Sequence, residues 1–147
     1  MMYRLDTNVV SEMRKAFPTP NRPSKSKIDR HVQAWVGSVS ASELYLSVVT
    51  VLELELGFLL LERRDPVQGA FIRSWIRGRV LESFSGRILA VDVAIARRCA
   101  SFHMPDPLGD RDALIAATAL VYGMTLVTRN VGHFERTGVA ILNPWLA

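Results

Sequence analysis

Short apolar runs alternate with longer amphipathic segments along the chain of 147 residues. The short runs predict strands over residues 3–6, 44–48, 87–91, 124–128 and 139–142. The longer segments predict helices from residue 9 onward and over residues 28–36, 51–62, 65–83, 92–102 and 110–122. Strands that alternate with helices form parallel crossovers, which place helices on both faces of one sheet. The pattern therefore predicts an α/β protein: a three-layer α/β/α domain with a central, mainly parallel sheet.

Local sequence signals support the predicted ends of two of these helices. Asp65 is a good N-cap, and Pro66 suits the first helical position. Phe71 and Trp75 then repeat at the i, i+4 spacing of one helix face. The apolar segment 110–122 is followed by Gly123, which is a favoured residue just after a helix end.

Composition supports a single globular domain over residues 1–147. The chain is 49% hydrophobic and 22% charged, and it contains no repeat and no linker-like stretch. Its apolar runs are far shorter than the ~20 residues that a membrane span needs. Arg4 and Asp6 interrupt the start, so no signal peptide is expected. Cys99 is the single cysteine and is expected as a buried, reduced thiol. A cytoplasmic protein without membrane contact is predicted.

Positive charge is concentrated in one segment of a chain whose net charge is +4. Residues 14–30 hold six cations against one acid, together with three prolines: Arg14, Lys15, Arg22, Lys25, Lys27 and Arg30, with Asp29, Pro18, Pro20 and Pro23. The composition predicts a solvated basic loop. A solubilising loop and an RNA-contacting loop both fit it, since a basic surface favours polyanions in general.

Polar residues fall at corresponding ends of several predicted strands. Asp6 ends the first strand, and Asn130 follows the strand over residues 124–128. Glu53 and Asp112 are each expected in the first turn of a helix that follows a strand or loop. Ligands of open α/β sheets bind beyond the carboxyl ends of the strands. Converging carboxylates would raise each other's pKa, and a hard cation such as Mg²⁺ or Mn²⁺ relieves that repulsion.

Each acid also has a purely local explanation. Asp6 can cap the next helix, and Thr50 with Glu53 has the T-x-x-E spacing of a capping box. Asp110 and Asp112 are favourable beside a helix N-terminus. The joint arrangement at one edge of the predicted sheet is what favours a site over a set of separate caps.

Four segments carry a resemblance to a known family. They are residues 5–8 (LDTN) with Ser11 and Glu12, residues 47–57 (SVVTVLELELG), residues 112–119 (DALIAATA) and residues 128–130 (TRN). In this order, and with the closing residues 143–145 (NPW), the chain resembles the PIN-domain family over nearly its whole length. The similarity is strongest to the VapC and FitB-like toxins of type II toxin–antitoxin systems.

This resemblance implies a metal-dependent endoribonuclease that hydrolyses RNA phosphodiester bonds. It also implies a homodimer, a cognate VapB-like antitoxin whose C-terminal segment occupies the active-site groove, and contact with operator DNA only through that antitoxin. By residue-by-residue match, Asp6, Glu53 and Asp112 correspond to the family's catalytic acids that hold Mg²⁺. Asn8 corresponds to the polar residue that accompanies the first acid. We expect Asn8 and Arg129 to bind substrate, although an ordinary surface arginine equally explains Arg129.

Two departures leave the fourth metal ligand and the number of ions open. Some relatives carry an acid where this chain has Asn130, and others carry one where it has His133. Asn130 could complete the metal shell through its carbonyl oxygen or a water, and Asp110 is a substitute contributor or an N-cap. His133 is otherwise expected as a surface residue. The three tryptophans are expected in the core or at a dimer interface: Trp35, Trp75 and Trp145.

Three other functions are weighed against this one. The same acids could serve a nuclease that cuts DNA. A catalytically weakened PIN domain that mainly binds an antitoxin/operator-DNA complex would explain the missing fourth acid. An unrelated α/β hydrolase ranks last, because the chain has neither a G-x-G-x-x-G loop nor a G-x-S-x-G nucleophile elbow. The sequence does not specify which RNA is cut.

Overall fold

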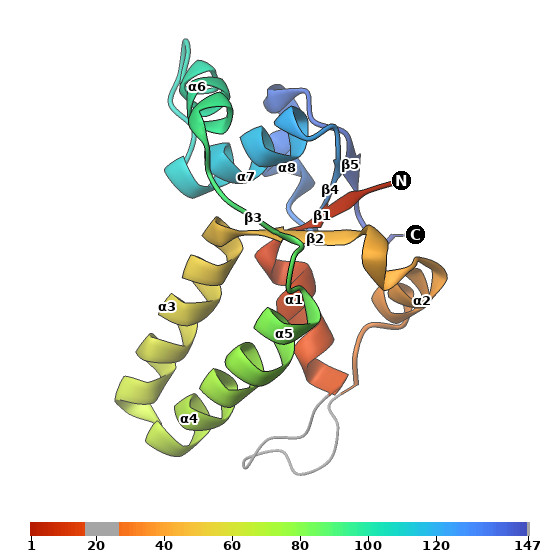
Figure 1. Ribbon diagram of the computed structural model, residues 1–147, viewed down its shortest axis with the longest axis vertical. Helices are drawn as coiled ribbons and strands as arrows, with labels where there is room; N and C mark the ends of the chain where they lie inside the picture. Colours follow the sequence, from red (N-terminus) through yellow and green to blue (C-terminus); the bar gives the residue numbers. More distant parts are fainter. Residues whose placement is uncertain (17–26, 147) are drawn as a thin grey trace.

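A five-stranded parallel sheet forms the centre of the protein (Figure 1). The computed structural model describes residues 1–16 and 27–146. The strand order is β3-β2-β1-β4-β5, and all four described strand pairs are parallel. The strands are β1 (Tyr3–Leu5), β2 (Leu44–Ser47), β3 (Ile88–Leu89), β4 (Thr125–Val127) and β5 (Ile141–Leu142). The N-terminal strand thus lies in the middle of the sheet.

Helices cover both faces of this sheet, which confirms the predicted three-layer α/β/α architecture (Figure 1). On one side lie α1 (Thr7–Met13), α2 (Arg30–Ser38), α3 (Val48–Arg64), α4 (Pro66–Trp75) and α5 (Leu81–Ser83). On the other lie α6 (Val93–Ser101), α7 (Asp110–Val121) and α8 (Val131–Phe134). Short 3₁₀ turns span Arg14–Ala16, Ala41–Glu43 and Glu135–Thr137, and a π-helical turn spans Ile76–Val80.

Each face of the sheet has its own hydrophobic core. Leu5 and Leu46 pack with Phe58 and Trp75 on the side of α1 to α5. Leu126 packs with buried residues of α7 and α8 on the other side, among them Ile115 and Phe134. Burial of both faces explains why the strands are mostly apolar. In the described part of the chain, no helix is long and apolar enough to cross a membrane.

The helix predicted over residues 51–62 begins three residues earlier, at Val48. The reason is an N-cap directly at the end of β2, where the Ser47 hydroxyl accepts a hydrogen bond from the Val49 N–H at 3.2 Å. Glu53 therefore lies in the second turn of α3, and its prediction in the first turn was wrong. The expected capping box of Thr50 and Glu53 does not form, because neither residue is at the required position.

Other element ends agree more closely with the sequence. Asp65 caps α4 by accepting from the Gln68 N–H at 3.1 Å, and Pro66 is the first helical residue. Gly123 has φ +66°, as its position after α7 requires. The π-helical turn and α8 were not predicted, and α2 continues through Gly37 where we expected it to end.

Two expectations from composition need amendment. Cys99 is half-buried and not fully buried, because its helix α6 packs against α7 and fully buries only Ile95. The partial burial still raises the pKa of its thiol, so that it stays protonated. Arg14 and Lys15 lie in a 3₁₀ turn that extends α1, and Arg30 begins α2, so these cations are not in a loop. Residues 17–26 of the predicted basic loop lie outside the described residues.

Candidate active site

A cleft of about 470 Å³ lies at the carboxyl ends of β1 and β4. All six residues predicted for the site line it, although they come from segments far apart in the sequence: Asp6, Asn8, Glu53, Asp112, Arg129 and Asn130. The remaining lining residues were not assigned to the site beforehand: Thr7, Ser11, Glu12, Arg14, Lys15 and Trp145. The sheet topology therefore brings the predicted polar positions together as expected.

Asp6 is fixed by the pairing of the two central strands. Leu5 of β1 is in register with Val127 of β4, so Asp6 lies beside Thr128. The Thr128 hydroxyl donates to Asp6 Oδ2 at 2.8 Å, and the Thr7 N–H donates to Asp6 Oδ1 at 2.8 Å. The side chain is only 6% exposed. Asp6 thus caps α1, as its local explanation required, and its carboxylate is also held at the wall of the cleft.

Thr128 connects the first strand to the loop after β4. Besides donating to Asp6, its hydroxyl oxygen accepts from the Asn130 N–H at 3.0 Å and from Asn8 Nδ2 at 3.3 Å. Asn8 Oδ1 in turn accepts from the Arg129 N–H at 3.4 Å. Sequence reasoning did not single out Thr128. Its position directly after a buried strand, in the TRN segment, was the available signal.

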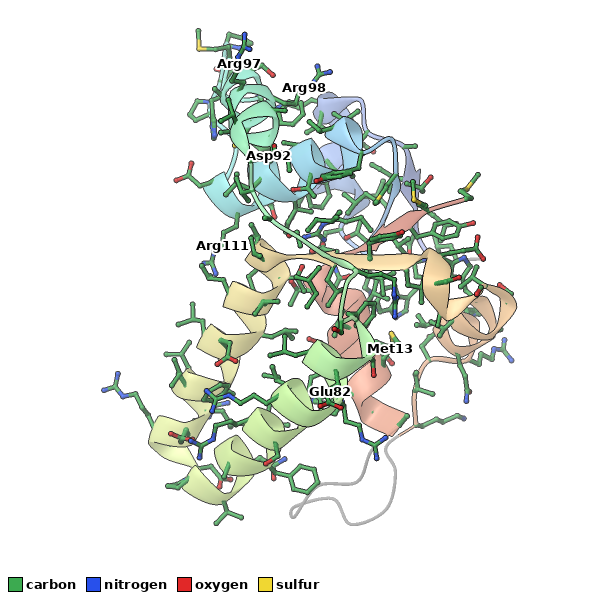
Figure 2. All side chains as sticks on the ribbon, viewed as in Figure 1. Met13, Glu82, Asp92, Arg97, Arg98 and Arg111 are labelled. Carbon is green, nitrogen blue, oxygen red and sulfur yellow. The ribbon has the colours of Figure 1, made fainter. Side chains whose placement is uncertain are left out.

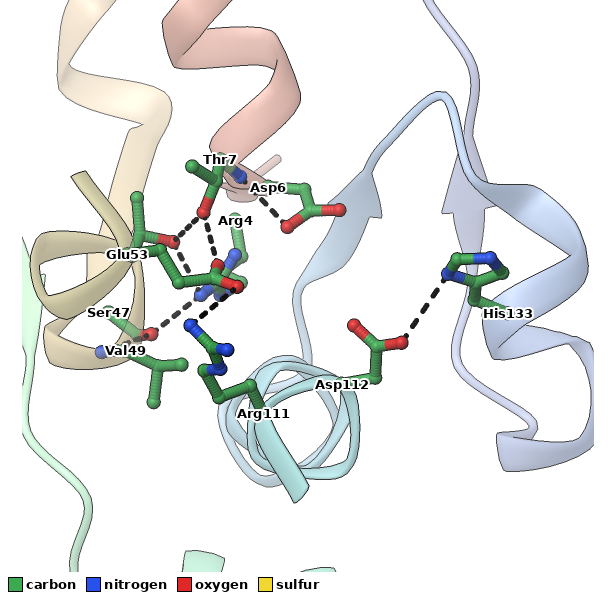
Figure 3. Close-up of polar contacts among 10 residues, drawn as sticks. Arg4, Asp6, Thr7, Ser47, Val49, Glu53, Arg111, Asp112 and His133 are labelled. Atoms are coloured by element: carbon green, nitrogen blue, oxygen red, sulfur yellow. Dashed lines mark hydrogen bonds and ion pairs between the residues drawn. The ribbon is translucent and has the colours of Figure 1, made fainter. Parts of the chain in front are cut away.

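Glu53 reaches the same cleft from α3. The Thr7 hydroxyl donates to Glu53 Oε1 at 2.6 Å (Figure 3). Arg111 extends from the start of α7 toward the start of α3, and its Nη1 lies 3.8 Å from Glu53 Oε2 (Figure 2). One carboxylate oxygen is therefore oriented by a hydroxyl, and the other faces a cation.

Asp112 enters from the first turn of α7, as predicted. Burial raises the pKa of its carboxyl above the ordinary value, and the nearby negative charge of Asp6 raises it further, while His133 acts in the opposite direction. His133 Nδ1 lies 3.4 Å from Asp112 Oδ2 (Figure 3). The expected repulsion between converging carboxylates is thus present at Asp112.

The two alternatives to Asn130 have different surroundings. Asp110 is 94% exposed, its Oδ1 lies 3.6 Å from His103 Nε2, and it does not line the cleft. It is not the N-cap of α7 either, because Gly109 holds that position. His133, although 60% exposed, lines a neighbouring hollow of about 350 Å³ that shares Asp112 with the main cleft. Its side chain therefore contacts an acid of the site.

The donor set fits a hard cation in chemistry. The cleft offers carboxylate oxygens of Asp6, Glu53 and Asp112 together with the Asn130 amide, and such oxygen ligands suit Mg²⁺ or Mn²⁺. Among the described residues, no group of three His, Cys, Asp or Glu side chains is arranged closely enough to hold a metal. The Glu53 carboxylate is engaged by the Thr7 hydroxyl and by Arg111, and not by the other two acids.

Cations and one aromatic ring line the rest of the cleft. The Arg129 guanidinium lies over the Trp145 ring, 5.2 Å from its centroid. Lys15 forms an ion pair of 3.0 Å with Glu12. Trp35 and Trp75 are buried as expected, whereas Trp145 is half-buried and contributes to the cleft. The available signal for Trp145 at the site was its place in the NPW ending that resembles the family.

The fold and the acidic cleft identify the class of protein. The family model of the PIN domain matches residues 3–140, so the chain belongs to the PIN-domain family. Among curated relatives, it is 36% identical to the VapC ribonuclease Y4jK of Sinorhizobium fredii, over 98% of each chain. It is 35% identical to the toxin FitB of Neisseria gonorrhoeae, over 98% of this chain and 99% of that protein.

Solved structures agree with this assignment. The crystal structure of FitAcB from Neisseria gonorrhoeae matches with a TM-score of 0.82 and 34% identity, over 99% of this chain and 100% of the other. The structure of FitAB bound to an IR36 DNA fragment matches with a TM-score of 0.79 and 34% identity, over 98% and 96% of the two chains.

Proposed function

We propose that this PIN-domain protein is a Mg²⁺-dependent endoribonuclease and the toxin of a type II toxin–antitoxin pair. The observation that carries the proposal is the convergence of Asp6, Glu53 and Asp112 in one cleft. The support from comparison is the near full-length similarity to proteins named VapC ribonuclease and toxin FitB.

Asp6 and Asp112 are the residues that we assign to hold the cation directly. Both face the cleft, and the Asp6 charge raises the pKa of Asp112, which indicates that the two carboxylates lie close enough to repel each other. Asn130 completes the shell through its amide oxygen or a water. A bound Mg²⁺ or Mn²⁺ would polarise the phosphate and make a water more acidic. Without a divalent cation, we expect no cleavage.

Glu53 is assigned either as a further ligand or as the group that orients the attacking water. Its Oε1 accepts from the Thr7 hydroxyl, and its Oε2 faces Arg111 Nη1 at 3.8 Å, beyond hydrogen-bond distance. We therefore assign Oε2 to accept a proton from that water. The water oxygen bonds to phosphorus while the bond from phosphorus to the leaving oxygen breaks, and the leaving oxygen takes a proton from solvent. Arg129, held over Trp145, contacts the RNA phosphates, and Asn8 supports the loop that carries Arg129.

The assignment as a toxin of a toxin–antitoxin pair also implies partner proteins. We propose a homodimer that is silenced by a VapB-like antitoxin, with operator DNA bound only through that antitoxin, in the cytoplasm. An exposed apolar strip on α3 supports the existence of a protein interface, because its members are large and between 40% and 56% exposed: Val48, Leu52, Leu56, Leu59 and Leu60. Light scattering of the purified chain, with and without the antitoxin, measures both assemblies.

A catalytically weakened PIN domain is the second candidate. Asn130 and His133 stand where relatives carry acids, and the described acids do not form a compact metal cluster. Such a protein would act mainly by binding in an antitoxin/operator-DNA complex, and it would show no specific binding in a Mg²⁺ titration.

Cleavage by the purified, antitoxin-free chain distinguishes these functions. RNA and DNA substrates are incubated with Mg²⁺, with Mn²⁺ and with EDTA, beside an Asp6→Asn variant. An asparagine oxygen can still accept from the Thr7 N–H, so this variant keeps the helix cap and is expected to fold. RNA cutting that needs the cation and is absent from Asp6→Asn supports the proposal. A folded wild-type chain that cuts no RNA refutes it, and cutting of DNA alone identifies a deoxyribonuclease.

A further inference from the structure

Arg4 is a charged residue in the interior of the central strand β1. Its side chain is 0% exposed and is the largest among the fully buried side chains. Nη1 donates to the Leu5 carbonyl at 2.6 Å, and Nη2 donates to Ser47 Oγ at 2.6 Å and to Thr50 Oγ1 at 2.9 Å. The guanidinium therefore lies between β1 and the first turn of α3.

This buried cation is incompletely paired. No carboxylate of the described residues lies within 4.0 Å of it, and its Nε has no hydrogen-bond partner. Burial lowers the pKa of Arg4 to about 10, and the negative charges of Asp6 and Glu53 oppose that shift. Arg4 thus remains charged at neutral pH. A buried charge without a direct partner is costly, and an apolar side chain of similar size would fill the same space at lower cost.

A chain of hydroxyl groups links Arg4 to the acidic cleft (Figure 3). Arg4 Nη2 donates to Thr50 Oγ1, which lies 3.4 Å from the Thr7 hydroxyl oxygen. Thr7 donates its proton to Glu53 Oε1 at 2.6 Å. Because one guanidinium nitrogen also contacts Ser47, the N-cap of α3, Arg4 fixes both the start of that helix and the acid that it presents.

We propose that Arg4 is a positioning residue of the acidic site. Its fork of donors holds Glu53 in place through Thr50 and Thr7, and its positive charge attracts the carboxylates of Asp6 and Glu53. The claim that Arg4 affects catalysis rests on the proposed function of Glu53. The claim that Arg4 and Glu53 are electrostatically coupled does not depend on that function.

A double-mutant cycle measures that coupling without any activity assay. Urea unfolding of the full chain in EDTA is recorded for wild type, Arg4→Met, Glu53→Gln and the double variant. The cycle compares the effect of Arg4→Met on the unfolding equilibrium constant in two backgrounds. The ratio of the Arg4→Met constant to the Arg4 constant should be about fivefold or more higher when Glu53 is present than in the Glu53→Gln background, whatever the sign of the single effect. Glu55→Gln is the matched control, since Glu55 lies on the same helix and pairs with Arg77 at the surface. Coupling to Glu53 no larger than coupling to Glu55 overturns the proposal.

Two further variants test the positioning role if Arg4→Met does not fold. Arg4→Lys retains the charge and should retain part of the coupling to Glu53. Thr50→Val removes the central hydroxyl at nearly constant volume and should lower kcat for RNA about tenfold, with KM within about twofold. A Thr50→Val variant with wild-type kcat contradicts the positioning role. If wild type cuts no RNA, the proposed function fails, and the unfolding cycle still decides on Arg4.

Discussion

Replacing Thr128 with valine tests how the acidic site is held together. The hydroxyl of this fully buried residue donates to Asp6 Oδ2 at 2.8 Å and accepts from the Asn130 N–H and from Asn8 Nδ2. Valine keeps the volume and the branched shape but removes all three hydrogen bonds. The substitution therefore isolates the polar contribution of one oxygen atom.

The expected loss follows from these partners. A hydrogen bond to a charged group contributes about 1.5–3 kcal/mol, and Asp6 is too buried for water to replace the lost donor fully. The Asn130 N–H and the Asn8 amide lie nearer the surface, so water can compensate for much of their loss. We expect Thr128→Val to lower the free energy of unfolding by about 2–4 kcal/mol. RNA cleavage should also slow, because Asp6 loses one of its two fixed partners.

Urea unfolding followed by circular dichroism measures this loss, and Thr118→Val is the matched control. Thr118 is equally buried, but its hydroxyl donates only to the Leu114 carbonyl one turn earlier in α7. Valine at this position should cost no more than about 1 kcal/mol, because that carbonyl keeps its helical hydrogen bond. The reasoning is refuted if Thr128→Val is no more destabilised than Thr118→Val.

Three further substitutions test other parts of the structure. Burial and Asp6 raise the pKa of Asp112, so the stability that this residue contributes is present at low pH and is lost as the pH rises through that pKa. Asp112→Asn should therefore have a higher urea midpoint than wild type above neutral pH. A gain in midpoint that persists unchanged in acid contradicts this. Trp145→Leu removes the ring beneath Arg129, worth about 0.5–1 kcal/mol, and should raise KM for RNA about two- to fivefold with kcat unchanged; an unchanged KM removes the ring from substrate binding. A Cβ at Gly69 would lie 2.5 Å from the backbone of α3, so Gly69→Ala should lower the free energy of unfolding by about 1–3 kcal/mol, measured by thermal unfolding. Gly57→Ala is the control, because a Cβ at Gly57 meets free space and should not lower the stability in this way. Equal effects of the two substitutions contradict the close helix contact.

The layered fold could be predicted because each buried strand and each amphipathic helix leaves a local pattern. The same alternation placed Asp6 and Asn130 at one edge of the sheet, and the register of Leu5 with Val127 then brought Asp6 beside Thr128. The exact start of α3 was missed, because a serine at the end of a strand caps the helix without any loop between them. Counted from this earlier start, Glu53 lies in the second turn of α3 and not in the first, but its side chain still lines the cleft.

Long-range contacts account for what the sequence did not reveal. Arg4 looks like a polar interruption of a strand. Its burial depends on hydrogen bonds to the neighbouring Leu5 carbonyl and to the hydroxyls of Ser47 and Thr50, which lie more than forty positions away. Trp145 packs partly against the core, as expected, but its ring also lines the cleft beneath the Arg129 guanidinium. Both cases depend on which segments meet in space, and no local propensity encodes that.

The most direct test of the central claim compares two neighbouring aspartates of α7. RNA cleavage in Mg²⁺ and equilibrium binding of Mn²⁺ are measured for wild type, Asp112→Asn and Asp110→Asn. The two substitutions change the same chemical group on the same turn, but only Asp112 lines the cleft, whereas Asp110 is 94% exposed. The account predicts that Asp112→Asn loses both cleavage and Mn²⁺ binding while Asp110→Asn retains both. Equal retention in the two variants, or equal loss, would contradict it.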